Sequence, residues 1–276
     1  IRKTDQRNHP DKYADQPKLI EILNSDQVLA YGEKPIQWDI PDILPSKARV
    51  IFGSAPKMGK TFTALDMAIS LATGSKFLNY FDIPSPKKVL FFEKEDSREL
   101  VGNRLRKLKN GRGLDAVENL SFTFDKKIKV DDPKWIEPLK KALDTVKPDI
   151  VFFDTFRRIH GLDENTSEEM EKICEILDQI MEDHGCSVIL IHHLNKASSN
   201  SQPLDELLSL RGSSALAGWA DAALIFRKGA GNHRTVNLIL KHATPVESFT
   251  FEIVDGIESI SLNWVGKTKE FWNAKN

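Results

Sequence analysis

Four short apolar runs stand out along the chain, each bounded by polar residues or glycine. A continuous run of this kind is typical of a parallel strand that is covered by helices on both faces. The runs are Ala48–Gly53, Lys88–Glu93, Pro148–Asp154 and Cys186–His193. Stretches with helical apolar spacing separate them, at Thr61–Thr73, Ser97–Leu108, Lys134–Val146 and Thr166–His184. This alternation predicts an α/β fold with a mostly parallel central sheet, flanking helices and right-handed crossovers.

Signals at the ends of one helix and a change of pattern after Trp219 complete this outline. Thr166 and Glu169 predict a capping box, and Gly185 predicts the helix end. Beyond Trp219, apolar and polar residues alternate with a period of two, which predicts hairpins that extend the sheet antiparallel. The four expected strands are Asp221–Arg227, Arg234–Lys241, Ser248–Val254 and Ile257–Trp264.

The first part of the chain has a different character. Residues 1–38 are polar and contain three prolines, and only Lys18–Tyr31 has helical apolar spacing. We therefore expect an N-terminal arm over residues 1–38, one main domain over residues 39–265, and a C-terminal tail over residues 266–276. The arm helix is expected either to pack on a neighbouring subunit or to fold back on its own domain.

Composition limits the cellular locations and the binding partners that we expect. The chain has 276 residues and a net charge of −1, so a strongly basic nucleic-acid-binding surface is not indicated by the totals. Cys174 and Cys186 lie in apolar stretches without disulfide or metal spacing, which favours buried reduced thiols and a cytoplasmic location. No apolar run approaches the roughly 20 residues of a membrane span, so no membrane partner is expected.

The strongest chemical signal is the segment SAPKMGKT, Ser54–Thr61, between a predicted strand and a predicted helix. It has the spacing of the phosphate-loop motif G-x-x-x-x-G-K-[ST], with Ser54 where the first glycine usually stands. In this motif backbone N–H groups cradle phosphates, the lysine places a positive charge on the terminal phosphates, and the hydroxyl ligates Mg²⁺. We therefore expect ATP and Mg²⁺ as cofactors, with Lys60 on phosphate and Thr61 on the metal. The expected nucleotide contacts are Ala55, Pro56, Lys57, Met58, Gly59, Lys60, Thr61 and Phe62.

Carboxylates follow two of the predicted strands. Asp154 ends an apolar strand, where a carboxylate can hold Mg²⁺ directly or through water, although it could also be a strand-end cap. Glu93, Glu95 and Asp96 end or follow another strand, and a carboxylate there can polarise the attacking water. We select Glu95 for this role; the alternative is a solvated acidic turn.

Two histidines, His192 and His193, close the fourth apolar strand. A polar group at this position can sense the γ-phosphate, while the alternative is a structural pair. Because the carboxyl ends of parallel strands meet at one edge, all these groups are expected to form one site.

Several segments resemble the RepA-type plasmid replicative helicases, which belong to the hexameric RecA/DnaB-like ATPases. The resemblance covers roughly residues 38–227, and the combination of D-T-x-R-R, H-H-x-x-K and R-G-S-S is more specific than the phosphate loop alone. The matching segments are Phe91–Leu108, Asp154–Met170, Gly185–Ser198 and Leu210–Leu216.

This resemblance implies a RecA-like fold and a homo-oligomer, usually a hexameric ring with ATP at each interface. It implies Glu95 as the catalytic carboxylate, Asp154 on Mg²⁺, His193 as a sensor, Arg211 as an arginine finger acting on the neighbouring subunit, and Arg104 near the adenine. The family's late K-x-R pair corresponds here to K-H-A beginning at Lys241, so the second basic residue is missing.

Two functions fit these features. The first is a ring motor that moves along single-stranded DNA, as a replicative helicase of a plasmid, virus or mobile element, with a primase or replication initiator as a possible partner. Arg157, Arg158 and Lys196 follow strand ends and would contact phosphates; the alternative for the two arginines is a solvated charge pair. The second function is a RecA-type regulatory ATPase that acts on a protein partner without helicase activity.

Overall fold

The computed structural model describes residues 20–56, 58–193, 214–241 and 247–268. The chain divides into two units, Ile1–Ile36 and Gln37–Asn276. None of the helices in the described ranges is long and apolar enough to cross a membrane.

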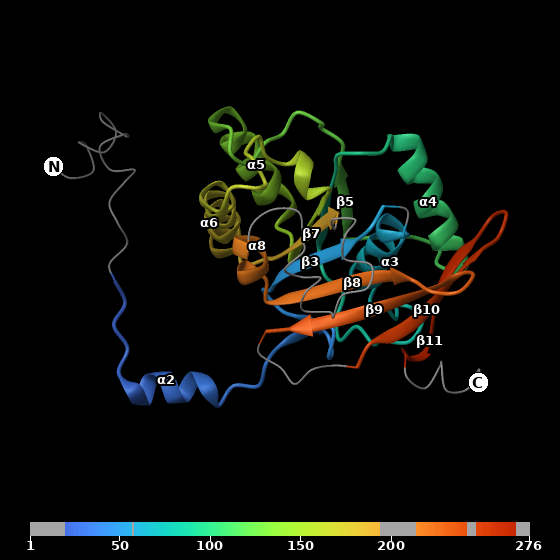
Figure 1. Cartoon of the computed structure of the whole chain (residues 1–276), viewed down its shortest axis with the longest axis horizontal. Coiled ribbons are helices and arrows are strands. Elements are labelled where there is room, and N and C mark those ends of the chain that lie inside the picture. The colour runs from blue at the N-terminus through green and yellow to red at the C-terminus, as the bar shows by residue number, and fades with distance from the viewer. Residues whose placement is uncertain (1–19, 57, 194–213, 242–246, 269–276) are drawn as a thin grey trace. The chain divides into compact units, whose positions relative to one another are not determined.

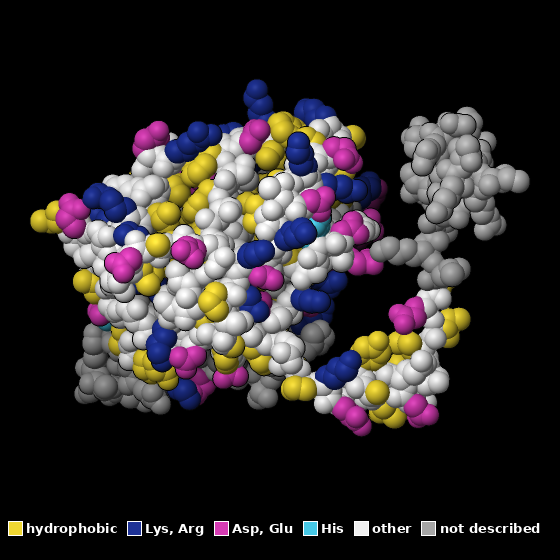
Figure 2. Space-filling model, turned by 180° about the vertical axis from the view of Figure 1, so that it is seen from behind, with side chains coloured by type: hydrophobic (Ala, Val, Ile, Leu, Met, Phe, Trp, Pro, Cys, Tyr) yellow, Lys and Arg dark blue, Asp and Glu magenta, His cyan; other side chains and the backbone are white. Residues whose placement is uncertain are grey.

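The first unit contains helix α2, Ser25–Gly32. This helix is shorter than the predicted stretch Lys18–Tyr31, because Asn24 forms a capping box with Gln27 and the helix begins after it. Residues 20–24 are not helical, and residues 18 and 19 lie outside the described ranges. No residue of α2 is buried, and Figure 2 shows its hydrophobic side chains open to solvent.

The second unit is built on one large sheet (Figure 1). Among the described residues nine strands form this sheet, in the order β11-β10-β9-β8-β3-β7-β6-β4-β5. A separate two-stranded sheet pairs β1, Trp38–Ile40, with β2, Leu44–Pro45. The strands of the large sheet are β3 Arg49–Ser54, β4 Val89–Glu93, β5 Leu120–Thr123, β6 Ile150–Asp154, β7 Ser187–His193, β8 Ala222–Lys228, β9 His233–Leu240, β10 Phe249–Asp255 and β11 Ile260–Lys267.

The pairing confirms the predicted mixed sheet and corrects two details. The four strands predicted from apolar runs pair parallel, and β9, β10 and β11 extend the sheet antiparallel. Strand β8 was predicted in the antiparallel group but pairs parallel with β3. Its residues 222–226 are all buried, as an internal strand covered on both faces requires. Strand β5 was not predicted, because its four half-buried residues carry no long apolar run.

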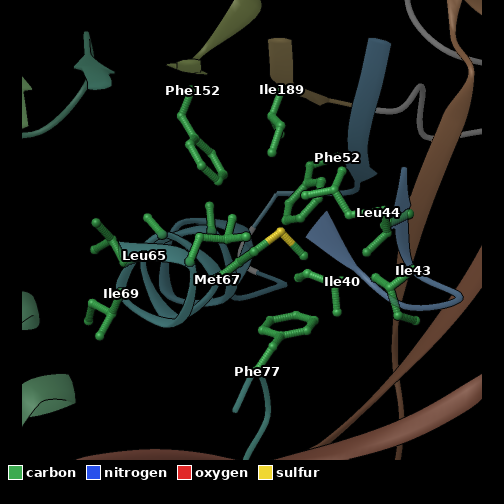
Figure 3. Close-up of a cluster of buried hydrophobic side chains, with 14 of the residues drawn as sticks. Ile40, Ile43, Leu44, Phe52, Leu65, Met67, Ile69, Phe77, Phe152 and Ile189 are labelled. Atoms are coloured by element: carbon green, nitrogen blue, oxygen red, sulfur yellow. The ribbon is translucent and has the colours of Figure 1, made fainter. Parts of the chain in front are cut away.

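Helices cover both faces of the sheet. Along β3, Phe52 belongs to a core cluster with α3 while its neighbour Ile51 belongs to a second cluster with α5, α6 and α8, because successive strand residues point to opposite faces. Figure 3 shows side chains of α3, the β1–β2 hairpin and strands β3, β6 and β7 meeting in the first cluster. The helices are α3 Lys60–Thr73, α4 Arg98–Gly111, α5 Pro133–Val146, α6 Ser167–His184 and α8 Ser214–Trp219.

The ends of α6 test the capping prediction. Gly185 terminates the helix in the left-handed conformation with φ 64°, as predicted, and its N–H bonds the Met181 carbonyl. The predicted capping box is wrong: the Thr166 side chain makes no cap hydrogen bond. Glu169 instead accepts a hydrogen bond from the backbone N–H of Asp163, which draws its carboxylate into the preceding turn.

A buried ion pair joins α3 to the end of α4. Nη2 of Arg112 lies 2.6 Å from Oδ1 of Asp66, and both side chains are at most 4% exposed. Arg112 also donates to the hydroxyl of Ser75 and the carbonyl of Lys76. Burial raises the pKa of Asp66, and Arg112 opposes that rise by favouring the carboxylate.

We expect Arg112→Met to reduce the free energy of unfolding by about 3–5 kcal/mol, because it leaves Asp66 buried without its cation. The double variant Asp66→Asn, Arg112→Met should show a smaller decrease in the free energy of unfolding, since the uncompensated charge of Asp66 is removed as well. Urea unfolding followed by circular dichroism measures both. Equal losses in the single and double variants would contradict this explanation.

The two cysteines give a second test of the core. Cys174 and Cys186 are free and buried, and burial raises their thiol pKa values to about 12 and about 11. A raised pKa keeps the thiol protonated, and therefore unreactive, at pH 8. We expect neither thiol to react with Ellman's reagent at pH 8 until the protein is unfolded in guanidinium, when both should react. Rapid labelling of the folded protein would contradict the buried placement.

Candidate functional site

The carboxyl ends of four parallel strands bring the predicted site residues to one edge of the sheet. Ser54 at the end of β3 is in register with His193 of β7, and Glu93 of β4 is in register with Asp154 of β6. Strand β7 lies between β3 and β6. The convergence predicted from the apolar runs is therefore present in the fold.

The phosphate loop leads from β3 into α3. Gly59 precedes the helix in the left-handed conformation, with φ 83°, which explains why glycine is required there. Helix α3 begins at Lys60, so the first backbone N–H groups of the helix face the space enclosed by the loop. Lys57, a predicted nucleotide contact, lies outside the described residues.

The Lys60 side chain points into the phosphate loop. Its Nζ lies 2.9 Å from the Ser54 carbonyl, 3.0 Å from the Ser54 hydroxyl and 3.0 Å from Nδ1 of His193. The ammonium can only donate, so it requires the unprotonated form of that nitrogen. Burial lowers the pKa of Lys60 to about 8, while Asp154 and Glu95 act in the opposite direction. Phosphate oxygens can replace these acceptors, and Ser54 supplies an acceptor that a glycine side chain could not.

Asp154 and Thr61 fit a magnesium site. Burial raises the pKa of Asp154 to about 8, with Glu93 and Glu95 acting in the same direction, while the nearby Thr61 side chain favours the carboxylate. One oxygen of Glu93, Oε2, is buried without a hydrogen-bond partner among the described residues. A hydroxyl, carboxylates and an unsatisfied oxygen form the donor set that hydrated Mg²⁺ prefers. The metal would supply positive charge to the terminal phosphates.

Glu93 and Glu95, two of the candidate carboxylates, have different surroundings. Oε1 of Glu93 accepts hydrogen bonds of 2.8 Å from the backbone N–H groups of Glu95 and Asp96, and the residue is fully buried. Glu93 therefore holds the turn that carries Glu95. The Glu95 side chain is 37% exposed and lines the pocket with Lys60 and Asp154, where it can reach a water molecule.

An open pocket of about 660 Å³ lies over these strand ends. Arg104 of α4 lines it, with its guanidinium 5.2 Å from the centre of the Phe62 ring and paired with Asp96. This flat cation and ring are suited to a nucleobase, and the adenine contact of Arg104 stays a prediction. The residues lining the pocket are Met58, Gly59, Lys60, Thr61, Phe62, Glu95, Asp96, Arg104, Asp154, His193, Asn232, Arg234, Ile253 and Asp255.

The other predicted residues lie either outside the pocket or outside the described residues. Arg157 and Arg158 lie in the short helix η2, Phe156–Arg158, directly after β6, and both side chains are 56% exposed. Lys241 donates to the Gly218 carbonyl, outside the pocket. Arg211 and Lys196 lie outside the described residues, so their predicted roles as finger and phosphate contact remain predictions.

Sequence reasoning missed the contribution of the C-terminal strands to this pocket. Asn232, Arg234, Ile253 and Asp255 come from β9, β10 and the turn before β9, more than 170 residues after the phosphate loop. Their period-two pattern predicted strands, but it carried no signal for contact with the loop. Only the antiparallel pairing of β9 and β10 brings them to this edge.

Glu95→Gln should lower ATP hydrolysis by about 10²–10⁴-fold, because an amide cannot accept the proton of the attacking water. Affinity for ADP should stay within about twofold, since the phosphate loop is untouched. Glu93→Gln keeps an oxygen acceptor for the turn and serves as the matched control, with a smaller expected loss. Steady-state phosphate release and fluorescent ADP binding measure the two effects. The reverse order of losses would assign the catalytic role to Glu93.

Comparison with known protein families agrees with this geometry. A family model described as an AAA domain matches residues 15–199, which is about two thirds of the chain. The match includes the phosphate loop and strands β3, β4, β6 and β7, whose carboxyl ends form the pocket. It ends before β8 to β11, so the C-terminal strands are characterised by the structure alone. The chain therefore belongs to the AAA domain family and is a P-loop ATPase.

Proposed function

We propose that this ATPase is a ring-forming motor that moves along single-stranded nucleic acid. The more specific proposal, from the resemblance to RepA-type proteins, is a replicative DNA helicase of a plasmid, virus or mobile element. Its cofactors would be ATP and Mg²⁺, and its track would be single-stranded DNA.

One contact carries this proposal. Nε of Arg158 lies 3.7 Å from Oε1 of Glu95, so the segment after β6 touches the predicted catalytic carboxylate. The two side chains are 56% and 37% exposed, which leaves the arginine accessible to a phosphate from solvent. A group that binds nucleic acid and also pairs with the catalytic carboxylate would connect occupancy of the track to hydrolysis.

The physical consequence follows from charge. While Arg158 is paired with Glu95, the guanidinium stands beside the carboxylate oxygen that a water molecule would contact. A backbone phosphate is a strong alternative partner for arginine. Exposed ion pairs are worth only about 0–1 kcal/mol, so a phosphate can displace Glu95 at little cost. Hydrolysis should then rise when a strand is bound.

Neighbouring contacts fix the backbone of this segment. Lys129 donates to the carbonyls of Arg158 and His160, at 2.9 Å and 2.7 Å. Arg157 lies 3.8 Å from Glu164 and not beside Glu95. The two adjacent arginines therefore have different partners, which allows binding and coupling to be tested separately.

The arm offers a surface for ring assembly. In α2, Val28, Leu29 and Tyr31 are 54%, 67% and 58% exposed, although all three have large apolar side chains. Burying these side chains on a neighbouring subunit would stabilise a ring. We propose this packing together with Arg211 as a finger in trans; a primase or replication initiator remains a possible further partner.

The alternative is a regulatory ATPase that acts on a protein partner. The net charge of −1 is compatible with it. The pairing of Arg158 with Glu95 favours the motor, because an exposed arginine is suited to a phosphate backbone. A regulatory ATPase should show no stimulation by oligothymidylate at low salt, whereas the motor should show severalfold stimulation that declines with salt.

Arg158→Gln and Arg157→Gln should separate coupling from binding. Arg158→Gln should abolish stimulation of hydrolysis at saturating oligothymidylate while basal hydrolysis changes by less than about fivefold, the worth of an exposed ion pair. Arg157→Gln should raise the oligonucleotide concentration for half-maximal stimulation but leave the maximal rate unchanged. Phosphate release measured across an oligonucleotide titration gives both parameters.

The charge-matched control is Lys172→Gln on the exposed face of α6, which should change neither parameter. Full maximal stimulation in Arg158→Gln would contradict the proposed coupling. Absence of any stimulation in the wild-type protein at low salt would instead support the regulatory alternative.

A further inference from the structure

Two residues of the C-terminal strands contact the phosphate loop at consecutive positions. Arg234 of β9 contacts Met58, and Ile253 of β10 lies against Gly59. The strands themselves are neighbours in the sheet, with Arg234 in register with Phe251. Both residues lie beyond the segment matched by the family model.

The contact of Arg234 with the loop is a charge-assisted hydrogen bond. Its Nε donates to the Met58 carbonyl at 3.0 Å, and its Nη1 donates to the His233 carbonyl at 2.7 Å. The second bond ties the guanidinium to its own strand, which limits the rotamers that the side chain can adopt. Burial lowers the pKa of Arg234, in agreement with a side chain held against protein and not freely solvated.

Ile253 meets the loop at the residue that must be glycine. A Cβ added to Gly59 would lie 3.1 Å from Cδ1 of Ile253, and Gly59 has a φ of 83°. The isoleucine therefore packs directly on the Gly59 backbone. Its own backbone N–H donates to the Asn232 carbonyl at 3.1 Å, which fixes it to the turn before β9.

The position of these contacts determines what they can do. The carbonyl of Met58 and the N–H of Gly59 belong to the same peptide, and a planar trans peptide directs these two groups in opposite directions. Fixing the carbonyl on Arg234 therefore fixes the direction of the Gly59 N–H. In phosphate loops N–H groups at this position bind phosphate. A loop that is already oriented loses less conformational entropy when nucleotide binds.

We infer that Arg234 is a positioning residue for nucleotide binding, which holds the Met58–Gly59 peptide in its phosphate-binding orientation while Ile253 packs on Gly59. In this arrangement the antiparallel extension of the sheet is part of the nucleotide site. The inference depends on the phosphate loop binding nucleotide, a property of the family, and not on the proposed movement along nucleic acid.

Arg234→Met removes the hydrogen bond and retains much of the side-chain volume. We expect it to raise the Kd for fluorescent ADP by about tenfold, the usual effect of losing a hydrogen bond to a charged group. Arg234→Lys should raise this Kd about threefold, because the lysine keeps the positive charge but lacks the planar guanidinium that bonds both carbonyls. Ile253→Ala should weaken binding about threefold by loosening Gly59 without changing any charge.

Lys228→Met is the matched control. Lys228 is exposed and lies in register with Arg234 on the adjacent strand β8. The variant therefore removes one positive charge close to Arg234 and leaves the Arg234–Met58 hydrogen bond in place. Its Kd for ADP should remain within about twofold of wild type. In steady-state kinetics, Arg234→Met should raise KM for ATP with little change in kcat, because the loop binds substrate and transition state alike.

Hydrogen–deuterium exchange distinguishes positioning from direct contact. Peptides covering residues 54–61 should exchange faster in nucleotide-free Arg234→Met than in wild type, whereas peptides of β6 and β7 should be unchanged. Weaker ADP binding with unchanged exchange in residues 54–61 would overturn the inference, since Arg234 would then act on the nucleotide itself. Equal losses in Arg234→Met and Lys228→Met would also overturn it, by showing a general charge effect. If Arg234→Met does not fold, Arg234→Lys and Ile253→Ala provide the same comparisons.

Discussion

Burial of the central sheet on both faces is the constraint on which the site depends. Helices cover both faces, so β3, β4, β6 and β7 are almost entirely buried and apolar along their length. Polar side chains that act on a ligand can therefore be placed only at the ends of these strands. Parallel pairing puts the carboxyl ends of all four strands at one edge of the sheet. Lys60, Glu93 and Asp154 are consequently buried ionisable groups: burial lowers the pKa of Lys60 and raises the pKa values of Glu93 and Asp154, and Lys60 and Asp154 oppose these shifts in each other. The low local dielectric that makes their burial costly also strengthens their interaction with phosphate and metal.

The segments around this edge are fastened by lysine side chains that bind backbone carbonyls. Buried Lys94 donates to the carbonyls of Asp125 and Ile128, at 2.8 Å and 2.6 Å, and Lys129 fastens the segment after β6. Glu93 holds the turn that carries Glu95, and Arg158 reaches back to Glu95. The predicted catalytic residue Glu95 is therefore positioned through its backbone by Glu93, while its side chain pairs with the exposed Arg158. This arrangement is the physical basis for the proposed coupling between nucleic acid and hydrolysis.

Local patterns were sufficient to predict the four parallel strands β3, β4, β6 and β7, the phosphate loop and the end of α6 at Gly185, because each depends on residues that are close in sequence. Strand β8 was assigned wrongly, because its apolar run Ala222–Phe226, the pattern typical of a buried parallel strand, was grouped with the alternating strands that follow it. The arm helix was predicted too long because apolar spacing continued upstream of the Asn24 cap. The contact of Arg234 with Met58 spans 176 residues and has no local signature. Lys57, Lys196 and Arg211 lie outside the described residues, so their roles stay predictions.

If these strand ends form an ATP site with Lys60 at its centre, Lys60→Ala should lose magnesium-dependent ATP hydrolysis. Phosphate release by the wild-type protein and by the variant measures this, with circular dichroism confirming that both are folded. We expect hydrolysis by the wild-type protein and a loss of about 10²-fold or more in the variant, because the cation that stabilises the phosphoryl charge is removed. Hydrolysis at the wild-type rate by folded Lys60→Ala would show that these strand ends are not the ATP site.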